Sequence, residues 1–82
     1  MPIEATKQDW ESTVGFITMG GVKVSGAIGN IHVARERIAA VAGVDADGLE
    51  DLGEVEDTLR ELEQKIEKLK TMFVGQAESL PA

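Results

Sequence analysis

The chain has 82 residues, enough for one small domain with a thin core, and chains this short often gain stability by self-association. It contains no cysteine and one histidine, which excludes disulfides, thiolate metal sites and a multi-histidine metal site within one chain. The net charge of -7 argues against nucleic acid as a ligand, because phosphate binding requires clustered Lys and Arg.

Residues 1–13 form a polar N-terminal segment of mixed charge. The stretch from Met1 to Glu11 has no apolar core of the kind that a signal peptide contains, so no secretory signal is expected. This pattern predicts a protein of the cytoplasm or of a soluble assembly.

Residues 14–34 form an apolar, glycine-rich segment in which Lys23 is the only certain charge. Lys23 lies at the middle of the segment, where a charge within a bilayer costs about 2.5–3.5 kcal/mol. Five glycines lower the hydropathy further. We therefore expect no membrane span.

The stretch 16–25 predicts a β-hairpin, because Gly20 and Gly21 form a two-residue turn signal between two apolar runs. In such a hairpin Met19 faces Val22, and the apolar side chains gather on one side of the sheet. The alternative is a continuous helix from about Asp9 onward, with apolar residues at helical spacing. Each interior glycine costs a helix about 1 kcal/mol, which favours the hairpin.

The same region predicts a tightly packed contact element rather than a flexible linker, because large apolar residues alternate with its glycines. The residues expected to pack are Trp10, Phe16, Ile17, Val22, Val24 and Ile28.

Residues 31–43 predict a short second helix. Asn30 can cap its N-terminus, and Gly43 is a natural stop at its C-terminus. Packing this helix against the C-terminal helix gives the simplest core within one chain.

Residues 44–73 predict an acidic turn followed by a long amphipathic helix from about Leu49 to Phe73. Asp47 and Glu50 have the spacing of a capping box at its start. The apolar residues alternate spacings of three and four, as in a coiled coil, and they are Leu52, Val55, Leu59, Leu62, Ile66, Leu69 and Phe73. We interpret this stripe as an oligomer interface; packing within its own domain is the alternative. Residues 74–82 form a small polar tail.

The acidic turn partly resembles a calcium-binding loop, with Asp45, Asp47, Gly48 and Glu54 at matching positions. Gly43 stands where the first ligand belongs, which favours an acidic helix start instead. The glycines around Lys23 lack the ending of a phosphate-binding loop, although a small anion held between subunits is an alternative. His32 and Glu36 form a pair without a nucleophile. We therefore expect no catalytic residues, no metal and no cofactor.

Together these patterns predict a mainly α, single-domain fold with a C-terminal coiled-coil-type helix, a shorter second helix and a β-hairpin at 16–25. They predict a non-catalytic, homo-oligomeric structural or assembly protein, for example of a virion, a filament or a secretion apparatus. Its partners would be further copies of itself and other proteins of the assembly. The alternative is an acidic adaptor or inhibitor that binds a basic protein through the run from Asp45 to Asp57. A small-anion-binding oligomer is the third hypothesis.

Overall fold

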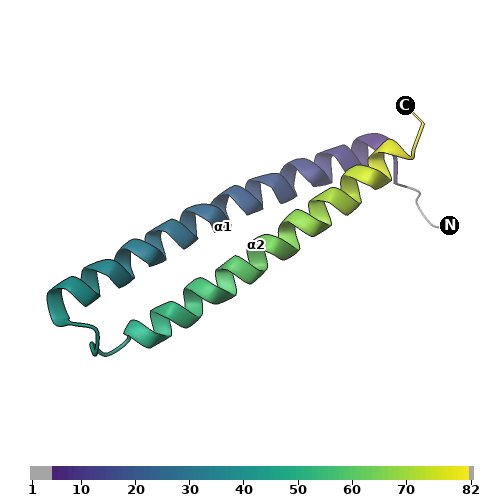
Figure 1. Ribbon diagram of the computed structural model, residues 1–82. Coiled ribbons are helices and arrows are strands. Elements are labelled where there is room, and N and C mark those ends of the chain that lie inside the picture. The colour runs from purple at the N-terminus through teal and green to yellow at the C-terminus, as the bar shows by residue number, and fades with distance from the viewer. Residues whose placement is uncertain (1–4, 82) are drawn as a thin grey trace.

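The computed structural model describes residues 5–81, which form a helical hairpin (Figure 1). Helix α1 spans Lys7–Ala42 and helix α2 spans Leu49–Glu78, and the loop 43–48 joins them. The two helices run antiparallel, so the beginning of α1 and the end of α2 lie at the end of the rod opposite the loop. The molecule measures 58 × 19 × 18 Å. The mainly α, coiled-coil-like architecture expected from the sequence is therefore confirmed.

The predicted β-hairpin at 16–25 is wrong, because this stretch lies inside α1 and residues 5–81 contain no strand. The continuous helix, which was the alternative, is the observed structure. The predicted short helix at 31–43 is the C-terminal part of the same helix, so Asn30 caps nothing. The reason is a heptad pattern that runs through the glycines and gives α1 one face to pack along its whole length.

The inward face of α1 consists of residues spaced alternately by three and four. They are half-buried or buried, and they are Trp10, Val14, Ile17, Gly21, Val24, Ile28 and Ile31. The Trp10 ring lies 5.3 Å from the Phe73 ring of α2, centroid to centroid. Because this packing is distributed over the length of the rod, it outweighs the local cost of the glycines.

Both ends of α1 are closed by local hydrogen bonds. At its start, Thr6 N–H donates to Asp9 Oδ2 at 2.8 Å and Asp9 N–H donates to Thr6 Oγ1 at 3.2 Å, which is a capping box. The backbone and hydroxyl hydrogen bonds from Thr6 lower the pKa of Asp9. At its end, Gly43 takes a φ of 90° and its N–H donates to Ala39 O, so the predicted stop is confirmed.

Helix α2 begins at Leu49, where the sequence predicts it, but it begins without a side-chain cap. Gly48 is the N-cap residue with a φ of 84°, and the expected capping box of Asp47 and Glu50 is not formed. The helix continues past Phe73 as far as Glu78, so most of the predicted tail is helical. The extra turn places Ala77, which is buried, against the beginning of α1.

The inward face of α2 alternates apolar and polar side chains. Its residues again follow spacings of three and four, and they are Leu52, Glu56, Leu59, Glu63, Ile66, Lys70, Phe73 and Ala77. Because Glu56, Glu63 and Lys70 occupy three of these eight positions, the seam between the helices holds a thin core. Ile28 and Ala77 are the buried hydrophobic residues of the described chain.

Two adjacent glycines of α1 should respond differently to alanine. A Cβ at Gly20 meets nothing within 4 Å. Gly20→Ala should therefore raise the free energy of unfolding by about 0.5–1 kcal/mol, because alanine loses less backbone entropy on folding than glycine does. A Cβ at Gly21 lies 3.3 Å from Ile66 Cγ2, so the same change there requires the Ile66 side chain to shift, which offsets the gain. We expect Gly21→Ala to be the less stable variant in urea unfolding monitored by circular dichroism. Equal stabilisation by both changes would contradict the packing described here.

Candidate interaction surface

The structure divides the predicted packing residues between two faces of α1. Trp10, Ile17, Val24 and Ile28 face α2, whereas Phe16 and Val22 are exposed. Phe16 is the most conspicuous of these, because 78% of its surface remains accessible. The segment is therefore packed on one side only.

The structure divides the predicted oligomer interface in the same way. Leu52, Leu59, Ile66 and Phe73 are half-buried against α1, so this part of the stripe packs within the chain. The other three, Val55, Leu62 and Leu69, are 42 to 45% exposed. We call these three residues the α2 ridge. Whether the ridge contacts another chain stays a prediction.

The ridge is exposed because the apolar stripe of α2 is rotated away from the seam. In the heptad of α2, Leu52 and its equivalents occupy one seam position, and Glu56 and its equivalents occupy the other. The ridge residues precede those polar seam residues by one position, which places them on the flank of the hairpin. A second helix covers the seam but leaves this flank open.

The outward side of α1 carries a second exposed apolar surface. Met19, Val22 and Val33 are 51 to 62% exposed, and exposed glycines lie between them at 15, 26 and 29. These six positions again alternate spacings of three and four, and we call them the α1 back. Along residues 12–34 Lys23 is the only fully charged side chain. The α1 back therefore presents apolar and small side chains to its surroundings.

Helix α1 is long and apolar enough to cross a membrane by length and composition alone, and little of its apolar stretch is fully buried in the hairpin. The same composition arises where a helix is covered by another protein. The α1 back is therefore an apolar surface that the hairpin itself leaves exposed.

The two helices carry opposite charge. α1 has four basic and three acidic side chains, a net charge of +1, whereas α2 has four basic and nine acidic side chains, a net charge of -5. The remaining negative charge lies outside the two helices. The acidic character of the chain is therefore concentrated on α2.

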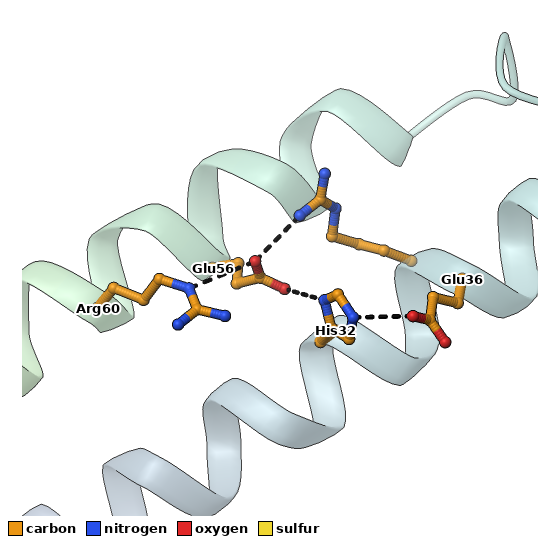
Figure 2. Close-up of polar contacts among 5 residues, drawn as sticks. His32, Glu36, Glu56 and Arg60 are labelled. Carbon is orange, nitrogen blue, oxygen red and sulfur yellow. Dashed lines mark hydrogen bonds and ion pairs between the residues drawn. The ribbon is translucent and has the colours of Figure 1, made fainter.

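A polar cluster joins the helices near the loop end of the rod (Figure 2). Glu56 of α2 is only 5% exposed. Its carboxylate oxygens lie 3.0 Å from His32 Nδ1, 3.1 Å from Arg35 Nη1 and 3.5 Å from Arg60 Nε. The other ring nitrogen of His32, Nε2, lies 2.8 Å from Glu36. Three basic groups thus surround one buried acid.

Burial acts to raise the pKa of Glu56, but its partners reverse this effect. The hydrogen bond with His32 and the charges of Arg35, His32 and Arg60 hold the pKa of Glu56 below its ordinary value. Glu56 therefore stays ionised in the fold and links the two helices. The Arg35 guanidinium packs over Gly53, 3.5 Å from the position that a Cβ would occupy there, which is an ordinary contact distance.

Sequence reasoning missed the role of Glu56. The available signal was its position, midway between Leu52 and Leu59 at spacings of four and three, which turns it toward the seam. Its basic partners Arg35 and His32 come from α1, which the sequence did not predict as one helix. Only the pairing of the helices identifies the cluster.

The residues of the chemical alternatives lie in α1, in the loop 43–48 and at the beginning of α2. Within 5–81 no group of three or more His, Asp or Glu side chains is placed to hold a metal ion. The glycines around Lys23 lie in a helix, whose N–H groups bond to its own carbonyls, so they form no anion-binding loop. A groove of about 510 Å³ lies beside Ser25 and Glu63, which hydrogen bond to each other.

Comparison of the chain with protein-family models, with curated proteins and with solved structures finds no match.

Replacing Glu56 by Gln should lower the urea midpoint of unfolding at pH 7. Because the pKa of Glu56 is depressed in the fold, its contribution is present at neutral pH and is lost as the pH falls through that pKa. The difference between wild type and Glu56→Gln should therefore shrink in acid. The exposed Glu54 supplies the control, since Glu54→Gln should change the midpoint little at either pH. A difference that does not depend on pH would contradict the ion-pair role.

Proposed function

We propose that the chain is a non-catalytic assembly module that forms homo-oligomers in an aqueous environment through its exposed apolar surfaces. The observation that carries this proposal is the α2 ridge, three large apolar side chains at seven-residue spacing that the hairpin leaves uncovered. Seven-residue spacing of this kind is typical of helix-to-helix contacts. Its exposure on an isolated chain costs free energy that a partner helix would recover.

The accessible area supports the proposal. The chain exposes 6361 Å², whereas a compact protein of 8.8 kDa exposes about 4,800 Å². The excess of about 1,600 Å² is twice the roughly 800 Å² that one partner loses in an interface of standard size. Each copy therefore has enough surface for two interfaces.

The thin core supports it as well. No large side chain of the described residues is fully buried. Two helices with such a seam gain little from burial against the entropy of ordering the chain. Binding of further copies to the folded state would stabilise the hairpin by mass action, so assembly and folding would be linked.

Insertion of the hairpin into a membrane would cost more free energy than contact with a protein partner. Insertion of α1 would place Lys23 near the centre of the bilayer and would separate α1 from α2 or carry the acids of α2 with it. The second candidate function is binding of a basic protein, which the net charge of -5 on α2 favours. Salt distinguishes the two, because charge-driven binding weakens with ionic strength and apolar self-association does not.

The test is the sedimentation of Leu62→Asp. Leu62 is exposed, so the change should leave the hairpin folded, as circular dichroism can verify, but should place a charge in the contact. We expect the wild type to sediment as an oligomer at high micromolar concentration and Leu62→Asp as a monomer. Gln64→Asp is the matched control, since Gln64 is exposed on another side of α2 and should leave the oligomer intact. A monomeric wild type would refute the proposal.

A further inference from the structure

We infer that the α2 ridge of one copy docks on the α1 back of the next. Neighbouring hairpins then lie side by side and contact each other through unlike faces, which is a head-to-tail arrangement. This inference rests on the self-association proposed above and names the two surfaces that meet. The occupant of each exposed face is therefore a second copy of this chain, bound through a different face.

The two surfaces complement each other in shape. The ridge consists of large side chains, whereas the α1 back contains Gly15, Gly26 and Gly29 among its larger residues. A Cβ at any of these glycines meets nothing within 4 Å in the single chain, so space is open above the backbone there. A leucine or valine of a neighbouring helix can approach the α1 backbone closely at such positions.

The charges favour this pairing over the symmetric ones. Two ridges in contact would bring together two α2 helices, each with a net charge of -5. Two α1 backs in contact would bring together helices of like sign with no acid between Glu11 and Glu36. Contact between α1 and the α2 of another copy joins opposite net charges, as the hairpin itself does.

The hairpin also supplies a register. His32 contacts Glu56 and Ser25 contacts Glu63. A move of one residue toward the C-terminus of α1 is therefore matched by a move of one residue toward the N-terminus of α2. Val33 therefore lies level with Val55, and Gly26 lies level with Leu62. A neighbour that is aligned with the same long axis, without an axial shift, keeps these levels.

In that register the central leucine of the ridge meets the central glycine of the back. Further along, Leu69 comes level with Met19 and Asp51 comes level with Arg37, which adds an apolar and an opposite-charge pair. Lys23 and Lys65 come level as well, and this pair opposes the contact. The apolar pairs flank it on both sides.

The contact has a consequence for the assembly. Because the two surfaces differ, each copy keeps one free ridge or one free back after a dimer forms, so growth continues. It stops only if the copies close into a ring. Each copy then uses both surfaces, in agreement with an exposed excess equal to two standard interfaces.

Mixing two variants tests the head-to-tail arrangement. Met19→Asp damages the back, and Leu62→Asp damages the ridge, so each should be monomeric alone. Mixed in equal amounts they should form dimers and nothing larger, because one intact ridge and one intact back remain. If Met19→Asp assembles like the wild type while Leu62→Asp does not, the contact is between two α2 helices and the inference fails, although self-association stands. If the wild type is monomeric and binds phosphatidylcholine vesicles through Met19, both proposals fail.

Gly26→Ala tests the contact with a variant that should not unfold the hairpin. In the single chain the added methyl group meets nothing, so the helix should become more stable. In the assembly it meets Leu62 of the neighbour, so self-association should weaken about tenfold. Unchanged or tighter association would contradict the close approach.

Crosslinking tests the register directly, because the chain has no cysteine of its own. Val33→Cys and Val55→Cys are prepared as separate proteins, so every disulfide must join two chains. We expect the mixed 33–55 disulfide to exceed the 33–33 and 55–55 products under mild oxidation, and to disappear when both proteins also carry Leu62→Asp. Predominance of either homodimer would overturn the head-to-tail arrangement.

Discussion

Two helices in a hairpin can cover only one face of each other, and most features of this molecule follow from that constraint. The seam uses one stripe of α1 and one stripe of α2, and the rod has a radius of gyration of 18.4 Å where a compact domain of its length has about 12 Å. No third element is present in residues 5–81 to cover the opposite faces. The apolar side chains on those faces therefore define the surface that is left for partners.

The sequence predicted α2 well because its apolar residues follow one period and its neighbours are charged, so propensity and pattern agree. It failed for α1 because the two kinds of evidence disagree there. The cost of Gly20 and Gly21 is local and easily counted, whereas the seam that offsets it depends on pairing with α2 over the whole rod. The packing energy of a heptad pattern that extends over the full helix therefore outweighs the preference of four residues for a turn.

The spacing predicted an apolar stripe on α2 but not which of its residues face α1 and which are exposed. Spacing alone places Leu59 and Leu62 on one stripe, and only the position of α1 decides that Leu59 turns inward while Leu62 stays exposed. The cluster around Glu56 shows the same limit, since two of its three basic partners, His32 and Arg35, come from the other helix. Periodicity identifies a face of a helix, and tertiary packing decides what covers each part of that face.

The glycines of the α1 back make the isolated hairpin less stable than it could be. Alanine at Gly26 or Gly29 would fit the single chain without contact and would make a better helix, so the hairpin alone gives no reason for glycine at either position. The proposed neighbouring helix would supply one, because at close range it would occupy the space that a Cβ would fill. The hairpin is in this sense less stable alone than its backbone permits. The stability that it lacks alone would come from the copies that pack against it, which links the weakness of the isolated chain to its proposed role in an assembly.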